Sequence, residues 1–171
     1  MLQRPTADEH APYYSTYTSL VPEGDVRDHL KRQLSETVAL LSGVSDERAS
    51  RAYGPEKWTL KEAVLHMADT ERVFGYRMLR IGRGDTTPLS GFEQDDWVPH
   101  SGANSRSLAS LVLEFATIRA ATLQLMESFD AAAWARRSTA SDKPVTVRAL
   151  AYICAGHELH HQKILRERYL A

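Results

Sequence analysis

Two histidines near the carboxyl end of the chain have the spacing of a metal site. His157 and His161 are four residues apart in the segment Gly-His-Glu-Leu-His-His, so a helix places their imidazoles one turn apart on one face. On a helical wheel both fall inside the apolar arc. A neutral imidazole needs both a donor and an acceptor as hydrogen-bond partners, and a shared cation satisfies two such rings together. The pair therefore predicts buried metal ligands, against the alternative of hydrogen-bonded core histidines.

A third histidine has the surroundings of a ligand on a facing helix. His66 lies midway along an amphipathic segment, between apolar neighbours and at the edge of the apolar arc. Three neutral imidazoles without a thiolate suit Zn²⁺, Ni²⁺ or Fe²⁺, and they leave coordination positions open for water or a substrate. We therefore predict that one divalent metal is held by His66, His157 and His161.

Two carboxylates are candidates for orienting a ligand or moving a proton beside this metal. Glu158 follows the first histidine of the pair, and Asp69 lies three residues after the lone histidine. A third carboxylate, Glu71, falls in the middle of an apolar arc, where an unpaired charge is costly. Glu71 is therefore expected to contact either the second ring nitrogen of a histidine or an inward arginine.

Other chemically reactive side chains have simpler interpretations. His160 is predicted at the rim of the site, and the single cysteine, Cys154, as a small core residue. The remaining histidines are predicted at the surface: His10, His29 and His100. Four arginines in or just after the second helical segment are either solvated or receive an acidic cofactor: Arg72, Arg77, Arg80 and Arg83.

Two known motifs overlap with residues 157–161. The segment reads H-E-x-x-H, the helix signature of zinc peptidases, but only ten residues follow it and none is a suitable third ligand. It also contains E-x-x-H, half of a di-iron bundle signature, but the chain has no second copy. We therefore favour neither a zinc peptidase nor a di-iron oxidase as the function.

Helical periodicity predicts the elements that position these residues. It covers four segments, residues 25–42, 58–81, 105–129 and 146–169. Thr59 and Glu62 form a capping box at the start of the second, and Thr146 caps the fourth. The connection 82–104 is long enough to cross along the bundle. The pattern predicts an all-α four-helix bundle, with a tyrosine-containing arm at residues 1–24 packed on it.

Composition excludes several classes of function. The chain has 171 residues, with 21 Lys and Arg against 22 Asp and Glu, so it lacks the basic excess of a nucleic-acid binder or a polybasic membrane anchor. One cysteine allows no internal disulfide. No signal-peptide pattern or membrane span is evident. We expect a cytoplasmic protein that acts on a small molecule, without nucleic acid or membrane partners.

Several segments together resemble the DinB/YfiT-like superfamily. They are Tyr-Gly-Pro-Glu-Lys-Trp-Thr-Leu-Lys-Glu at 53–62, His66 with Asp-Thr-Glu-Arg-Val-Phe at 69–74, and Gly-His-Glu-Leu-His-His at 156–161. The resemblance implies one domain over 1–171, folded as an up-down-down-up four-helix bundle with one long crossover, often as a homodimer. It also implies a divalent metal, commonly Ni²⁺ or Zn²⁺, on His66, His157 and His161. Characterised relatives are thiol-dependent.

Two hypotheses for function follow. In the first, the chain is a metal-dependent enzyme of the thiol S-transferase or hydrolase type, in which the metal activates a low-molecular-weight thiol or water toward an electrophile. In the second, it is a non-catalytic metal-binding module of the stress response, in which the metal staples the bundle. An open three-ligand site is unlike the closed four-ligand shell of structural zinc, and this favours the first.

Overall fold

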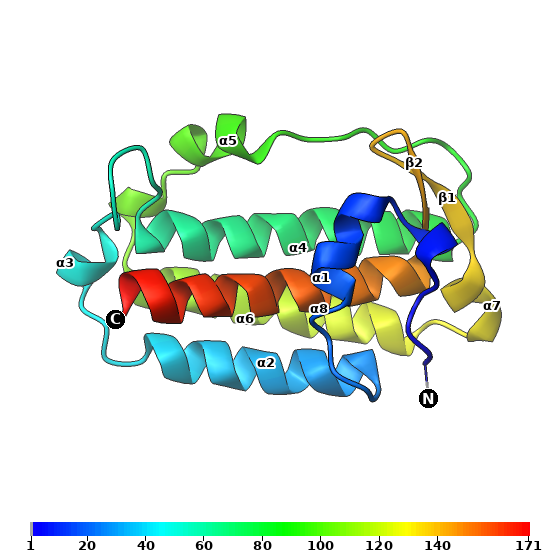
Figure 1. Ribbon diagram of the computed structural model, residues 1–171, viewed down its shortest axis with the longest axis horizontal. Coiled ribbons are helices and arrows are strands. Elements are labelled where there is room, and N and C mark those ends of the chain that lie inside the picture. Colours follow the sequence, from blue (N-terminus) through cyan, green and yellow to red (C-terminus); the bar gives the residue numbers. More distant parts are fainter. Residues whose placement is uncertain (1) are drawn as a thin grey trace.

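The computed structural model describes residues 2–171, so Met1, the first residue of the predicted arm, lies outside the described residues. Within them, four long helices pack side by side as a bundle (Figure 1): α2 (Val26–Leu41), α4 (Leu60–Gly82), α6 (Leu108–Glu127) and α8 (Val147–Ile164). The four helical segments predicted from periodicity are confirmed, with small differences at their ends.

Side-chain caps determine where these helices begin. Thr59 Oγ1 accepts a hydrogen bond from the Glu62 backbone N–H at 3.1 Å, and the Glu62 carboxylate accepts the Thr59 N–H at 2.7 Å, which is the predicted capping box. Asp25, Ser107 and Thr146 likewise accept a backbone N–H in the first turn of α2, α6 and α8. Fixed starts for α4 and α8 also fix which of their residues face each other.

Shorter elements connect and cover the bundle. They are α1 (Ser15–Thr18), α3 (Asp46–Ala49), α5 (Gln94–Trp97) and α7 (Ala131–Ala135), with 3₁₀ turns at Ala7–Glu9, Pro12–Tyr14, Val98–His100 and Ala103–Ser105. Figure 1 shows that the connection between α4 and α6 runs back along the bundle and carries α5. The helix α1 packs on α8, so the described part of the N-terminal arm lies on the bundle.

A small hairpin lies between α7 and α8, where no strand was predicted. β1 (Arg137–Ala140) pairs antiparallel with β2 (Lys143–Thr146). Its turn residues Ser141 and Asp142 have φ of 52° and 59°, the left-handed backbone that tight hairpin turns require. Strands of four residues are too short to show a convincing alternation of apolar and polar side chains. The prediction of helices alone was therefore incomplete.

Helix α6 is more apolar than its burial requires. By length and composition it could cross a membrane, but a core helix of a soluble protein can pass the same test. In the fold, 28% of its most apolar window is buried. This corrects the expectation that no segment would approach a membrane span. Leu113 is 68% exposed and lines an apolar surface groove between α6 and the end of α2.

The last helix changes its winding near the C-terminus. The sequence predicts one helix through residue 169, whereas α8 ends at Ile164 and Leu165–Tyr169 form a π-helical turn. A π turn adds a residue to the repeat and shifts the face on which the following side chains lie. Tyr169 is thereby placed against the start of α4, where its hydroxyl donates to the Trp58 carbonyl at 2.7 Å.

Candidate metal centre

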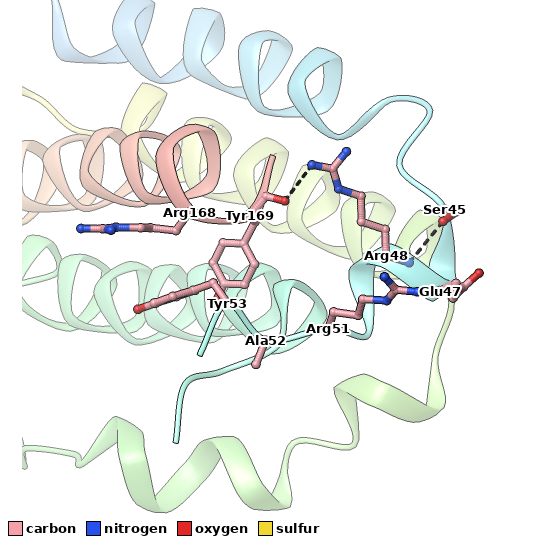
Figure 2. A pocket seen from close by; sticks show the side chains of 8 residues that line it. All are labelled: Ser45, Glu47, Arg48, Arg51, Ala52, Tyr53, Arg168 and Tyr169. Atoms are coloured by element: carbon pink, nitrogen blue, oxygen red, sulfur yellow. Dashed lines mark hydrogen bonds and ion pairs between the residues drawn. The ribbon is translucent and has the colours of Figure 1, made fainter. Parts of the chain in front are cut away.

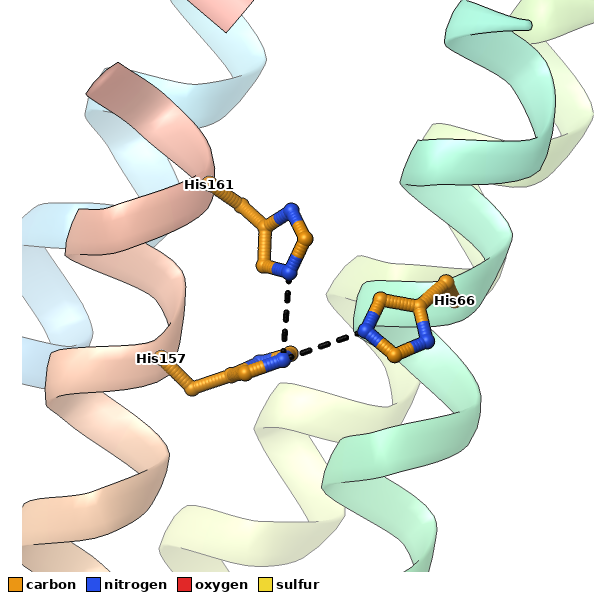
Figure 3. A group of neighbouring side chains, drawn as sticks. All are labelled: His66, His157 and His161. Atoms are coloured by element: carbon orange, nitrogen blue, oxygen red, sulfur yellow. Dashed lines mark hydrogen bonds between the residues drawn. The ribbon is translucent and has the colours of Figure 1, made fainter. Parts of the chain in front are cut away.

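Three buried histidines converge between α4 and α8. The Nε2 atom of His157 lies 3.2 Å from Nε2 of His66 and 3.1 Å from Nε2 of His161. One ligand atom from each ring lies within 4.8 Å of the others. Figure 3 shows His157 and His161 extending from successive turns of α8 toward His66 on α4. The structure thus brings together the three residues predicted to hold a metal.

The spacing of these nitrogens fits a shared cation better than hydrogen bonds among imidazoles. A neutral imidazole carries one N–H, so two contacts at the same His157 nitrogen cannot both be satisfied unless the two partners supply the protons. A tetrahedral ion with metal–nitrogen bonds of about 2.0–2.1 Å separates its ligand atoms by about 3.3 Å. The observed separations of 3.1 and 3.2 Å are close to this value.

Burial keeps these imidazoles in the neutral form that binds metals. It lowers the pKa of His66 to about 4. Burial also lowers the pKa of His157 and of His161 well below the usual range, and the neighbouring imidazoles add to the effect. The charged form is disfavoured because it would lose hydration and face like charges. At neutral pH the three rings therefore present lone pairs.

Aromatic side chains enclose the histidines. The Trp58 ring centroid lies 4.8 Å from that of His66, and the Tyr17 ring meets His157 edge-on at 5.5 Å. Thr70 Oγ1 lies 3.4 Å from His66 Nδ1, where it can accept that ring's N–H when Nε2 is the ligand atom. These contacts limit how far the His66 and His157 rings can rotate.

The two carboxylates predicted to assist catalysis make their contacts elsewhere. Glu158 Oε1 accepts from Thr37 Oγ1 at 2.7 Å, and Asp69 accepts from Arg72 at 2.8 Å near the surface. Within residues 2–171, neither carboxylate hydrogen-bonds to the three histidines. Their proton-transfer roles stay predictions. The contacts in the structure tie Glu158 to Thr37 on α2 and Asp69 to Arg72 on its own helix.

A buried charge network lies at the centre of the bundle. Arg119 is fully buried and binds Glu71 with two hydrogen bonds, 2.8 Å from Nε and 2.7 Å from Nη2. Its Nη1 donates to the Leu30 carbonyl at 2.8 Å. Glu158 Oε2 lies 2.7 Å from Arg119 Nη2, as an ion pair without hydrogen-bond alignment. Glu71 thus pairs with an inward arginine, one of its two predicted partners.

Two hollows reach the histidines from the surface. One, of about 450 Å³, is lined by His161 with Trp58, Lys57 and Asp95. The other, of about 230 Å³, is lined by His157 with Tyr17 and Glu93. Asp95 and Glu93 come from the crossover, which sequence reasoning treated only as a connection. No local pattern distinguishes them, because their position depends on how the crossover lies along α4.

Several side chains predicted at the surface are internal. His10 and His29 are buried, and their rings are hydrogen-bonded there, His10 to the Ala11 carbonyl and His29 to the Glu23 carbonyl at 3.1 Å. His100 is exposed, as expected.

The arginines proposed to receive an acidic cofactor have partners within the described chain, namely Arg72 with Asp69 and Glu114, Arg77 with Ser90 and Ser141, Arg80 with Asp85, and Arg83 with Ser128.

Comparisons with known proteins agree with this fold. The chain superposes on YfiT from Bacillus subtilis with a TM-score of 0.74 and 12% sequence identity, over 89% of this chain and 97% of that one. That protein is described as a probable metal-dependent hydrolase with an unusual four-helix bundle topology. No curated protein matches the chain. The family model of the DinB superfamily matches residues 29–165, which include all three histidines. The chain belongs to the DinB superfamily.

Proposed function

We propose that this protein is a divalent-metal-dependent enzyme whose metal is held by Nε2 of His66, His157 and His161. The convergence of three buried, neutral imidazoles on one point carries the proposal. Ni²⁺ and Zn²⁺ are the favoured ions and Fe²⁺ the third, because the donor set is nitrogen only. A bound divalent cation lowers the pKa of water or of a thiol, and either can then act as the nucleophile.

Hydrolysis is the reaction we favour first, and thiol transfer second. The description of YfiT as a probable metal-dependent hydrolase supports this order. The hollow at His161 supports catalysis over a purely structural metal, because it leaves a route for a small molecule to a ligand side chain. The proposal includes the up-down-down-up helix order, which a crossover running along the bundle supports.

Metal content tests the site directly. The protein is stripped with a chelator, reloaded separately with Ni²⁺, Zn²⁺ or Fe²⁺, and assayed by elemental analysis and calorimetric titration. We expect one metal per chain, with a large loss of affinity in His66→Ala, His157→Ala and His161→Ala. His160→Ala is the matched control, because His160 neighbours the pair but lies outside the converging group. Unchanged metal content in the triple variant would overturn the proposal.

Activity distinguishes the enzyme from a metal-stapled module. Metal-loaded and stripped protein are compared on ester, amide and thioester hydrolysis and on transfer of a thiol to a model electrophile. We expect at least one reaction to need both the metal and the three histidines. A thermal melt accompanies the assay. A large fall in melting temperature on stripping, with no reaction in the panel dependent on metal, would favour the non-catalytic module.

A further inference from the structure

One buried guanidinium contacts all of the other long helices of the bundle. Arg119 of α6 binds the Glu71 carboxylate of α4 with two hydrogen bonds, at 2.8 and 2.7 Å. Its Nη1 donates to the Leu30 carbonyl of α2 at 2.8 Å, and its Nη2 lies 2.7 Å from the Glu158 carboxylate of α8. Because hydrogen bonds weaken when they are misaligned, Arg119 restricts how α2, α4 and α8 can turn relative to one another.

A second set of buried polar contacts joins α8 to α2. Thr37 Oγ1 donates to Glu158 Oε1 at 2.7 Å and accepts from Gln162 Nε2 at 2.9 Å. Gln162 Nε2 also donates to the Gln33 carbonyl at 3.2 Å. The side chains of Thr37, Glu158 and Gln162 are all buried. One hydroxyl of α2 thus holds two residues of α8 that lie one helical turn apart.

The two residues held by Thr37 directly follow two histidines of the candidate metal centre. Glu158 follows His157, and Gln162 follows His161. Helix α8 packs against both α2 and α4 (Figure 1). The polar pair meets α2, whereas the histidines extend toward α4 (Figure 3). The contacts with α2 and the metal centre therefore occupy neighbouring faces of the same two turns.

The rotation of α8 about its axis determines where these histidine nitrogens lie. A nitrogen about 6 Å from the axis of a helix moves by about 1 Å when the helix turns by about 10°. The distances in a metal site vary by only about 0.2 Å. Apolar packing is not directional, and four of the six residues before His157 have small side chains or none: Ala151, Cys154, Ala155 and Gly156. Directional contacts on the α2 face are therefore well suited to set the rotation.

We propose that Thr37 and Arg119 are positioning residues for the metal centre. They hold α8 in the rotation that brings Nε2 of His157 within 3.2 Å of Nε2 of His66 and keeps His161 beside it. Within residues 2–171, neither residue hydrogen-bonds to the three histidines, so both act through the helices. The effect on a bound ion rests on the proposed function, whereas the placement of the rings is also a property of the metal-free protein.

Two variants of Thr37 separate positioning from stability. Thr37→Val keeps the shape of the side chain and removes its hydroxyl, whereas Thr37→Ser keeps the hydroxyl and removes a methyl group. Co²⁺ is titrated into each metal-free protein, and visible absorption reports affinity and ligand geometry. We expect Thr37→Val to bind Co²⁺ about tenfold more weakly or worse, with altered absorption bands, and Thr37→Ser to stay close to the wild type.

Ile81→Val is the control for lost stability, because Ile81 is a core residue in the last turn of α4, far along that helix from His66. We expect it to bind Co²⁺ as the wild type does. Wild-type affinity and absorption bands in Thr37→Val would overturn the proposal. Losses of affinity that are equal in Thr37→Val and Thr37→Ser, or in Thr37→Val and Ile81→Val, would also overturn it, because they would reflect stability alone.

Proton NMR of the metal-free protein tests the same inference without the ion. The ring centroids of His66 and His157 lie 5.1 Å apart, so we expect nuclear Overhauser contacts between their ring protons in the wild type and in Thr37→Ser. These contacts should weaken in Thr37→Val and in Arg119→Lys, which keeps the charge without the planar fork. Contacts of full strength in both variants would overturn the proposal. A wild type that binds no Co²⁺ but shows this dependence would reject the proposed function and support the positioning role.

Discussion

Gly156 lies directly beneath the Tyr17 backbone, without room for a side chain between them. A Cβ atom on Gly156 would lie 2.9 Å from Tyr17 Cα and closer still to the Tyr17 carbonyl. This contact seats α1 on α8 one residue before His157. It also explains why a glycine interrupts a helix that is otherwise suited to larger side chains, since glycine is unfavourable in helix interiors by about 1 kcal/mol.

Gly156→Ala is expected to lift α1 from α8. Overpacking against backbone costs about 1 to 3 kcal/mol, and the displaced arm uncovers the Tyr17 side of His157. Urea unfolding measures the loss of stability, and amide hydrogen exchange shows whether protection falls in residues 13–21. Gly75→Ala is the control, because its Cβ would meet nothing closer than 3.8 Å and alanine favours the helix. Equal stability of both variants would contradict this account.

Arg119→Met is expected to destabilise the fold by about 3 to 5 kcal/mol, because it leaves the buried carboxylates of Glu71 and Glu158 without their cation. Burial already raises the pKa of Glu158, against the opposing effect of Arg119. Chemical denaturation measures the change. Arg72→Met serves as the comparison, since its ion pairs are near the surface and are worth about 1 kcal/mol or less. A cost for Arg119→Met no larger than for Arg72→Met would count against the network.

Helical phase predicts the metal centre because the inward orientation of each histidine depends on residues close to it in the sequence. The four-residue interval between His157 and His161, and the apolar neighbours of His66, suffice to place all three rings on inward faces. The same reasoning leaves the partner of Glu71 open, because Arg119 reaches it from another helix 48 residues away. It likewise gives Glu158 a role beside the metal, whereas Thr37 on α2 binds its carboxylate.

Features that depend on long-range packing escape the sequence analysis. The pattern places His29 at the edge of a helix, whereas the structure buries it. The backbone carbonyl of Glu23, which precedes the helix, bonds its ring there. Figure 2 shows a surface hollow lined by arginines from residues 48–51 and by Arg168, which are far apart in the sequence. That both segments reach one hollow depends on the π turn at Leu165–Tyr169, an irregularity that helix periodicity does not encode.

Trp58 is expected to report metal binding through its fluorescence. Its ring lies against His66, so a paramagnetic Co²⁺ or Ni²⁺ ion at the three histidines quenches its emission. Titration should give a saturable decrease with one metal per chain, and Zn²⁺, which has a filled d shell, should quench little. Trp58→Phe removes most of the decrease while Trp97 and Trp134 remain as emitters. The same quenching in His161→Ala would show that the metal binds elsewhere.

Glu9 is expected to make the attachment of the N-terminal arm sensitive to acid. Its carboxylate accepts from Thr146 Oγ1 at 2.7 Å and from Arg148 Nε at 3.1 Å. Burial alone would raise the pKa of Glu9, but these bonds and that from Thr6 outweigh it and lower the pKa from 4.5 to about 2. Because the folded-state pKa is the lower one, the stabilisation is complete above about pH 4.5 and is lost as the pH falls toward 2.

Glu9→Gln tests this linkage when its stability is compared with that of the wild type by urea unfolding at several pH values. At pH 7 we expect the variant to be less stable by about 1 to 2 kcal/mol, because charge-assisted hydrogen bonds are replaced by neutral ones. The difference should shrink between pH 4.5 and 2, since the carboxyl of the unfolded wild type takes up a proton in this range while that of the folded protein does so only near pH 2. Glu36→Gln, on the exposed face of α2, controls for a general change in charge. A difference that stays constant down to pH 2.5 would mean that the ionised form of Glu9 does not hold the arm.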